Sequence, residues 1–243
     1  MRVIVTRPED SGWRTAERLE ALGHTPILLP LTTPVHDPQA ADNALATPHA
    51  ALAITSAEAV QVLFQLGPRL SPFLNEPVFV VGTASAKAAQ ACGFRNVHCG
   101  PGTGIGLAEL VAGFNVNSSD PILYLAGSPR SPAFEESLAV RIVPLTVAEI
   151  YRMLPLAYEA RALERTFVQE QPDAVLIYSR ENARLFYQLA ASYGHVLKHL
   201  LVLGISESIA EPVPLDFRNK MRIAERPDED SLFALLSRPC PAN

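Results

Sequence analysis

The chain has 243 residues, of which 48% are hydrophobic and 19% are charged, and its net charge is −5. This composition is far from that of a disordered chain, and the acidic balance without a basic block makes the chain a poor candidate for sequence-independent binding to nucleic acid. No window approaches the roughly 18 apolar residues of a membrane helix, and the first residues lack a signal-peptide pattern, so we expect a cytoplasmic protein without nucleic-acid or membrane partners.

Short apolar runs alternate with helical patterns, which predicts parallel sheets built from βα units. The predicted strands span residues 2–6, 26–29, 51–55, 78–81, 96–98, 122–125, 141–145, 174–178, 200–203 and 221–224. The predicted helices span residues 11–22, 57–66, 85–92, 105–114, 133–138, 158–169, 180–193 and 230–236. In the first helix, Trp13, Ala16, Leu19 and Leu22 recur at helical spacing, which predicts one apolar face.

An internal repeat appears in permuted order. Residues 51–66 align with residues 174–189 at an offset of 123, which places Ser56 on Ser179. Residues 80–89 align with residues 202–211, which places Gly82 on Gly204. The third pair breaks the order, because residues 143–146 match residues 29–32 near the N-terminus. Any one match between βα units could arise by chance, but three matches of consistent spacing favour a duplication.

The copies have similar lengths only if the N-terminus completes the C-terminal copy. We therefore expect one α/β domain from residues 1–32 together with 155–243, and a second from residues 36–147. Residues 33–35 and 148–154 would be the interdomain crossovers, lying side by side as a hinge or a two-stranded linker. Because open α/β sheets bind ligands beyond the carboxyl ends of their strands, the site should lie in the loops at those ends.

Hydroxyl, glycine and arginine residues gather at these predicted loops. Free N–H groups at helix N-termini attract anions, and arginine suits carboxylates and phosphates, so we expect an anion site there. Serine and threonine are also common N-caps, and each hydroxyl could serve only as a cap. Likewise, 17 of the 20 basic residues are arginine, which a codon bias would equally produce. The candidate ligand-binding residues are Arg7, Thr55, Ser56, Gly82, Thr83, Ser85, Ser128, Arg130, Ser179, Arg180, Gly204, Ser206 and Ser208.

Other enzyme signatures fail inspection. The run from Gly100 to Gly106 does not match a dinucleotide fingerprint, and no phosphate loop or Gly-x-Ser-x-Gly elbow occurs. The six histidines show no metal-ligand spacing. Cys92, Cys99 and Cys240 fit neither a zinc site nor a disulfide framework, so we expect reduced thiols and no metal. Chemistry at this site would therefore rely on orientation, charge stabilisation and a proton donor.

An ordered set of motifs resembles the uroporphyrinogen-III synthase family along essentially the whole chain. The motifs are VTRP at 5–8, AITSAEAV at 53–60, VVGTASAKAA at 80–89, ILYLAGSPR at 122–130, VAEIYRM at 147–153, VLIYSRENA at 175–183 and VLGISESIAE at 202–211. The resemblance implies two flavodoxin-like parallel-sheet domains joined by a two-stranded linker, with one domain discontinuous in sequence. This expectation agrees with the repeat.

The resemblance also implies the reaction. The family cyclises linear hydroxymethylbilane to uroporphyrinogen III, with loss of water and inversion of ring D through a spiro intermediate, and it needs no cofactor. Hydroxymethylbilane would be the small-molecule substrate of a monomer that contacts the preceding pathway enzyme at most transiently. The many carboxylates of this substrate suit a site formed by helix N-termini and arginines.

Tyr151 aligns with a family tyrosine thought to assist departure of the hydroxyl group. A phenol can donate a hydrogen bond to that leaving group while remaining protonated at neutral pH. The alternative is a tyrosine that only packs in the linker. The family often has threonine two positions later, where this chain has Met153.

Two other functions stay open from the residues alone: a two-lobed module that binds small anions without catalysis, and a nucleotide-sugar or dinucleotide enzyme, which the glycine pattern opposes.

Overall fold

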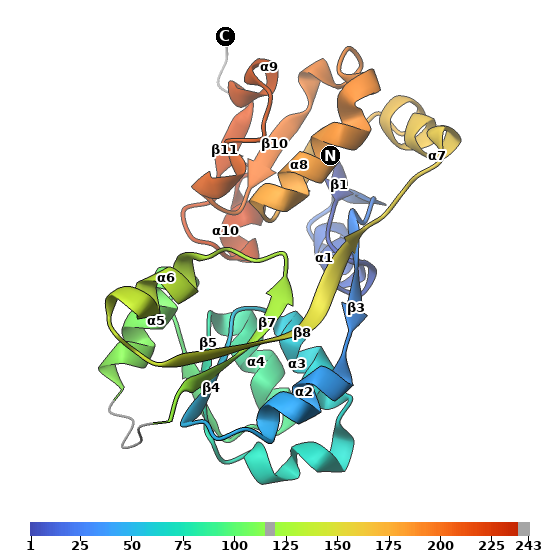
Figure 1. The fold of residues 1–243 in the computed structure, drawn as a ribbon. Helices are drawn as coiled ribbons and strands as arrows, with labels where there is room; N and C mark the ends of the chain where they lie inside the picture. Colours follow the sequence, from blue (N-terminus) through green and yellow to red (C-terminus); the bar gives the residue numbers. More distant parts are fainter. Residues whose placement is uncertain (115–119, 238–243) are drawn as a thin grey trace. The chain divides into compact units, whose positions relative to one another are not determined.

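Two compact units make up the protein. The structure, a computed structural model, describes residues 1–114 and 120–237. Unit 1 combines Met1–Thr33 with Leu154–Asn243, and unit 2 is Pro34–Met153. Each unit is built on a largely parallel β-sheet with helices packed against it (Figure 1). The predicted fold class, two parallel-sheet α/β domains of which one is discontinuous in sequence, is confirmed.

The sheet of unit 1 places the N-terminal strand in its interior. Its order is β11-β10-β9-β1-β2, and every adjacent pair is parallel. Numbered along the chain within unit 1, this is the 2-1-3-4-5 order of flavodoxin-like sheets. The strands are β1 (Arg2–Val5), β2 (Thr25–Leu28), β9 (Ala174–Ile177), β10 (Leu201–Gly204) and β11 (Met221–Ile223).

Helices cover both faces of this sheet. Ile4 faces a core formed with α8 and the α7 region, whereas Val3 and Val5 face a core formed with α1 and α10. The α-helices are α1 (Glu9–Ala21), α7 (Ala160–Glu164), α8 (Arg180–Ala190), α9 (Leu215–Arg218) and α10 (Glu229–Ala234). Shorter helical turns span Arg165–Gln169, Ala191–Tyr193, Leu197–His199 and Glu207–Ile209.

Unit 2 has a six-stranded sheet of order β3-β8-β7-β4-β5-β6. Its strands are β3 (Thr32–His36), β4 (Ala51–Ile54), β5 (Pro77–Val80), β6 (Asn96–Cys99), β7 (Ile122–Ser128) and β8 (Leu145–Pro155). Its helices are α2 (Pro38–Leu45), α3 (Ala57–Phe64), α4 (Thr83–Cys92), α5 (Gly104–Gly113) and α6 (Ala133–Val140), with a 3-10 helix over Gly67–Phe73. One face of the sheet packs on α2, α3 and α4, and the other on α5 and α6.

The two sheets confirm the predicted repeat. Strand β4 corresponds to β9 at the predicted offset of 123, and both end in a serine that caps the following helix. The order β11-β10-β9-β1-β2 matches β6-β5-β4-β7-β8 strand for strand. The five corresponding strands of unit 2 are therefore a circular permutation of those of unit 1, because the first of them in the chain, β4, corresponds to β9, the third strand of unit 1. The permuted order of the strands is as predicted, but the third sequence match itself is wrong, because residues 143–146 lie at the start of β8 whereas residues 29–32 follow the end of the corresponding strand, β2.

The chain passes between the units as a two-stranded ribbon of β3 and β8 (Figure 1). Asp37 N donates to Ile150 O at 2.8 Å, and Leu156 N donates to Leu31 O at 2.9 Å. The residue number on one strand falls as the other rises, so the two strands are antiparallel. The strand pairs β4–β5, β4–β7, β5–β6 and β7–β8 are parallel, so β3 is an antiparallel edge strand.

Two local predictions are wrong. The strand predicted at residues 141–145 begins only at Leu145, because Ile142 has a positive φ of 58° and Arg141 and Ile142 form a turn. In α1, Trp13 and Leu22 are 56% and 57% exposed. The buried face instead combines Ala16 and Leu19 with Gly12 and Thr15. Small and hydroxyl residues therefore face the sheet where the spacing predicted large apolar ones.

Asn182 connects the two halves of unit 1 through a buried polar network. Its Oδ1 accepts from Thr6 Oγ1 at 2.6 Å and from Tyr178 N at 3.3 Å, and its Nδ2 donates to Thr6 O at 3.2 Å. Thr6 is fully buried and Asn182 is 9% exposed. A buried amide satisfied in this way holds the end of β1 against the start of α8.

We expect Asn182→Ala to destabilise the protein by about 1–3 kcal/mol, because buried partners in Thr6 and Tyr178 lose their hydrogen bonds. Urea unfolding monitored by circular dichroism measures the change. Gln188→Ala, an exposed position on the same helix, is the control and should change stability by less than about 0.5 kcal/mol. Equal stability of the two variants would contradict a role for the amide.

Candidate active site

The strand order reverses at one place in each sheet, between β1 and β9 in unit 1 and between β4 and β7 in unit 2. Ligands of open α/β proteins bind beyond the carboxyl ends of the strands at such a switch point. The loops there carry Arg7, Tyr178 and Ser179 in unit 1. Those of unit 2 carry Thr55, Ser56 and the segment from Gly127 to Arg130. Predicted site residues thus follow the strands at both switch points.

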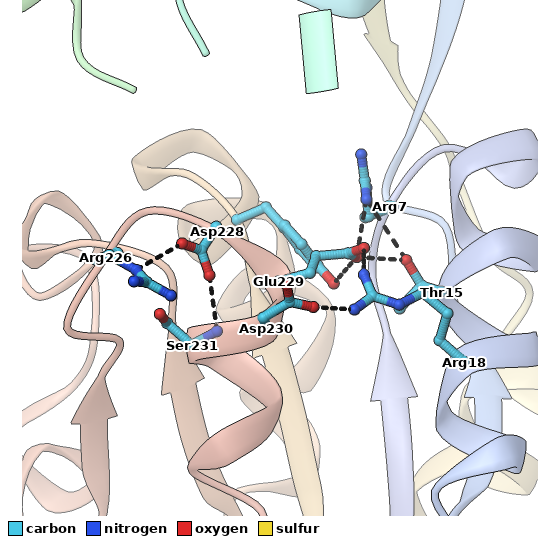
Figure 2. A network of polar contacts seen from close by, with 9 residues as sticks. Arg7, Thr15, Arg18, Arg226, Asp228, Glu229, Asp230 and Ser231 are labelled. Atoms are coloured by element: carbon cyan, nitrogen blue, oxygen red, sulfur yellow. Dashed lines mark hydrogen bonds and ion pairs between the residues drawn. The ribbon is translucent and has the colours of Figure 1, made fainter. Parts of the chain in front are cut away.

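In unit 1, the carboxylate of Glu229 lies at the centre of a polar cluster (Figure 2). Its Oε1 accepts from Arg7 Nη1 at 2.8 Å, from Thr15 Oγ1 at 2.7 Å and from Tyr178 Oη at 2.8 Å. Its Oε2 accepts from Arg18 Nη1 at 2.7 Å, and Arg18 also pairs with Asp230. The cluster joins the first turn of α10 to α1 and to the loops after β1 and β9.

The neighbouring charges and burial determine the protonation states of Glu229 and Tyr178. Burial opposes ionisation of Glu229, but the hydrogen bond from Thr15 and the charge of Arg7 lower the pKa of its carboxyl below the ordinary value. Burial raises the pKa of Tyr178, and the neighbouring Glu229 carboxylate raises it further. The guanidinium carbon of Arg7 lies 4.9 Å from the centre of the Tyr178 ring. At neutral pH, Tyr178 is therefore a neutral hydrogen-bond donor to an ionised Glu229.

In unit 2, Tyr151 lies on β8 opposite Gly127 of β7 and is 8% exposed. Burial raises the pKa of its phenol to about 12, and a hydrogen bond with Ser56 partly offsets this rise. Tyr124 and Glu58 also raise the pKa of Tyr151, whereas Arg130 lowers it. Tyr151 consequently stays protonated across the physiological pH range and is close to Ser56, which is itself a predicted site residue.

Arg130 is held by two carboxylates of its own unit. Its Nε donates to Glu135 at 2.6 Å, and its Nη1 donates to Glu149 at 2.7 Å. The hydrogen bond to Glu135 raises the pKa of the guanidinium, so Arg130 is a permanent cation. Beside it, Thr55 Oγ1 lies 2.6 Å from Tyr124 Oη. The structure thus groups Thr55, Ser56, Tyr151 and Arg130 around the end of the sheet.

The other two predicted arginines also bind carboxylates of the protein: Arg7 binds Glu229, and the exposed Arg180 binds Glu211 at 2.6 Å. A guanidinium has five N–H donors, so one ion pair does not prevent a second carboxylate from binding. It does reduce the positive field that each arginine offers to a ligand.

The remaining predicted residues divide between capping, exposed and buried positions. Ser56 and Ser179 are N-caps whose hydroxyls accept from Glu58 N and Asn182 N at 3.2 and 3.1 Å. Gly82 is the N-cap of α4, Gly204 ends β10, and Ser128 ends β7. Thr83 is exposed at the start of α4, whereas Ser85 is 4% exposed. Ser206 Oγ and Ser208 Oγ lie 2.8 Å apart on the surface.

Within residues 1–114 and 120–237, no group of three His, Cys, Asp or Glu side chains could hold a metal ion. Cys92 is half-buried and Cys99 is exposed, and Cys240 lies outside the described residues. None of the helices in the described part of the chain has the length and apolarity needed to cross a membrane.

Comparison with known proteins identifies the family. A family model described as uroporphyrinogen-III synthase HemD matches residues 14–234. The chain belongs to the uroporphyrinogen-III synthase family. Family members are lyases of tetrapyrrole biosynthesis. A search of curated proteins gives no significant match.

Solved structures of uroporphyrinogen-III synthases have a similar fold. The Helicobacter pylori enzyme has a TM-score of 0.62 and 16% identity, with 97% of this chain and 98% of that chain covered. A mutant uroporphyrinogen III synthase from Thermus thermophilus has a TM-score of 0.57 and 18% identity, with 97% of each chain covered. These similarities show the shared fold. Nothing in them favours the alternative of a binding module without catalysis.

Sequence reasoning missed several residues of the two clusters. Glu229 forms an ion pair with Arg7, which is 222 positions away in the sequence, and no local sequence pattern predicts such a pair. Tyr178 stands directly before the predicted Ser179, so its position was a usable signal. Tyr124 lies within the strand predicted at residues 122–125, which looked purely structural, and Gly127, expected in the loop after that strand, is part of β7.

The lowered pKa of Glu229 predicts a pH dependence of stability. A carboxyl whose pKa is lower in the folded state stabilises the protein above its unfolded pKa, and this stabilisation is lost as pH falls through the folded pKa. Wild type should therefore exceed Glu229→Gln in stability near pH 7, and the difference should shrink on acidification below the ordinary carboxyl pKa. Urea unfolding at several pH values measures this.

Glu20→Gln removes an exposed carboxylate from α1 and is the control. Its stability should run parallel to that of wild type. If the difference between wild type and Glu229→Gln stayed constant from neutral to acidic pH, Glu229 would not be the ionised centre of the cluster.

Proposed function

We propose that this protein is a uroporphyrinogen-III synthase that cyclises hydroxymethylbilane to uroporphyrinogen III. The observation that carries the proposal is the family match over residues 14–234. The incubation of the purified protein with freshly prepared hydroxymethylbilane tests it. The expected product is the type III isomer, whereas formation of only the spontaneous type I isomer would overturn the proposal.

The reaction needs charge stabilisation and orientation more than it needs a cofactor. The C–O bond of the ring A hydroxymethyl group breaks, and the pyrrole nitrogen supplies the electron pair, which leaves an azafulvene cation. The departing oxygen gains a proton and leaves as water. The substituted carbon of ring D then attacks the cation and forms a spiro intermediate. Fragmentation and closure at the other carbon invert ring D, and loss of a proton restores the aromatic pyrrole.

Tyr151 is proposed as the group that assists departure of the hydroxyl. Its pKa of about 12 keeps the phenol protonated, so the hydroxyl is available as a hydrogen-bond donor at neutral pH. Such a weak acid contributes chiefly through a hydrogen bond that strengthens as negative charge develops on the leaving oxygen. Ser56, which lowers the pKa of Tyr151, is proposed to help to orient the phenol.

The carboxylates of the substrate are proposed to bind at the switch-point loops of the units and at the ends of the neighbouring strands β5 and β10. Helix N-termini supply N–H donors there, and the arginines add cations that share their donors with protein carboxylates. The proposed binding residues are Arg7, Thr55, Ser56, Gly82, Thr83, Ser85, Ser128, Arg130, Ser179, Arg180, Gly204, Ser206 and Ser208. The buried Ser85 has the weakest support among them.

The proposed setting is a cytoplasmic monomer without a cofactor. Hydroxymethylbilane closes spontaneously to the type I isomer, so rapid capture from the preceding pathway enzyme would favour the type III product. This chemistry supports a transient contact between the two enzymes.

We expect Tyr151→Phe to lower kcat by about 10²-fold or less and to leave KM nearly unchanged, because the lost hydrogen bond strengthens only in the transition state. The product should remain the type III isomer, since isomer choice depends on how the site folds the tetrapyrrole. Single-turnover kinetics with isomer analysis of the oxidised product measures both. Tyr193→Phe is the control, because it removes the hydroxyl of a half-buried tyrosine in unit 1 that has no part in the proposed site. Wild-type kcat in folded Tyr151→Phe would leave Tyr151 a packing residue.

Substrate binding should also depend on salt. Exposed ionic contacts are screened strongly at high ionic strength, where the Debye length falls from about 10 Å at 0.1 M to about 3 Å at 1 M salt. We therefore expect the apparent KM to rise as salt is increased to molar concentration. A KM that does not change would argue against carboxylate binding at these loops. Because many groups share the contact, no single serine or arginine substitution should abolish binding.

A further inference from the structure

A β-bulge in β8 determines the face of the sheet on which Tyr151 lies. Ala126 of β7 pairs with Glu149, but the next residue, Gly127, pairs with Tyr151. Ile150 is therefore the extra residue of the bulge, without a partner on β7. Bulges of this kind redirect the side chains that follow them.

The cores on the two faces show the effect. Before the bulge, Val147 faces the core formed with α5 and α6, and Ala148 faces the core formed with α3 and α4. Strict alternation would place Tyr151 on the face of Val147, because side chains alternate with a period of two. Instead, Tyr151 and Ile150 both belong to the core with α3. This face is also that of Ser56 and Glu58, at the start of α3.

Gly127 supplies the space for the redirected ring. A Cβ atom at Gly127 would lie closer than 3.0 Å to Cζ, Cε2 and Oη of Tyr151. Paired residues of neighbouring strands project from the same face, so the phenol ring lies directly over the glycine backbone. Two ring carbons and the hydroxyl oxygen of Tyr151 thus occupy the volume that a side chain at position 127 would fill.

We propose that Gly127 is a positioning residue for the reaction, which together with the bulge at Ile150 places the Tyr151 hydroxyl beside Ser56. This inference rests on the proposed function of Tyr151. Any side chain at position 127 displaces the ring and moves the hydroxyl, while the remainder of the sheet keeps its pairing. Gly127 itself touches no reacting atom in this proposal and acts only through Tyr151.

Gly127→Ala tests the proposal in the full-length protein. We expect kcat to fall as much as in Tyr151→Phe, by about 10²-fold or less, with KM close to the wild-type value. Gly113→Ala is the matched control, because a Cβ at Gly113, the last residue of α5, meets no atom within 4 Å. Its kcat should equal that of wild type. Wild-type kcat in Gly127→Ala would overturn the proposal.

Two readouts do not depend on activity. In protein labelled with ¹³Cζ-tyrosine, the Tyr151 resonance, assigned by its loss in Tyr151→Phe, should shift in Gly127→Ala and remain in place in Gly113→Ala. In addition, Gly127→Ala should lower Tm in the wild-type background but not in the Tyr151→Ala background, where no ring overlaps the new methyl group. An unmoved resonance, or an equal loss of Tm in both backgrounds, would overturn the proposal.

The same design covers a variant that fails to fold. If Gly127→Ala is unfolded while the double variant with Tyr151→Ala folds, the glycine is required by the ring, as proposed. If neither folds, Gly127 serves some other part of the fold and the proposal is wrong. Should the wild-type protein produce no type III isomer, the proposed function fails, yet the resonance and the Tm comparison still decide whether Gly127 positions Tyr151.

Discussion

The position of β1 constrains the rest of the structure. This strand lies between β2 and β9, pairs in parallel with both, and buries Val3, Ile4 and Val5 completely. A central parallel strand has no other way to satisfy its backbone groups, so unit 1 can form only when the N-terminal segment meets residues that follow position 173. The chain must therefore leave unit 1 and return to it. The ribbon of β3 and β8 is the direct result, and Tyr151 lies on the returning strand.

Duplication has kept the backbone at the two switch points but not the charges. In unit 1 the centre is a carboxylate, Glu229, surrounded by donors from Arg7, Arg18, Thr15 and Tyr178. In unit 2 the centre is a guanidinium, Arg130, between Glu135 and Glu149. The phenols differ accordingly: Tyr178 is tied to an ionised acid, whereas Tyr151 is associated with the hydroxyl of Ser56. A phenol that donates its hydrogen bond to a carboxylate of the protein is less available to a leaving group. This difference favours Tyr151 over Tyr178 as the hydrogen-bond donor, independently of the family resemblance.

The sequence predicts those features whose causes are local or repeated. The strands from β4 to β7 and the caps Ser56 and Ser179 follow from apolar runs and hydroxyl positions that recur at a fixed offset. The face of Tyr151 does not, because alternation along β8 is broken by one inserted residue that only strand pairing shows. Glu229 could not be predicted either, since the pairing of the two chain ends must be known before its partner Arg7 can be assigned. The prediction that Trp13 is buried was wrong, because helical spacing does not show how large a side chain fits between the helix and the sheet.

The environment of Tyr151 limits what a proton donor contributes to the proposed reaction. A phenol whose pKa is about 12 never ionises at neutral pH, so it is always in the donating form, yet it is a poor acid by the same measure. Efficient general acids have a pKa near the working pH, and this site moves the pKa of Tyr151 further from it. Expulsion of the hydroxyl must then draw mainly on the electron pair of the pyrrole nitrogen. The contribution of the protein is then mainly positional. The bulge and Gly127 orient one neutral hydrogen bond from Tyr151, and the site holds the two ends of the substrate together. A site of this kind is expected to be more sensitive to an atom displaced by an ångström than to the loss of any one charge.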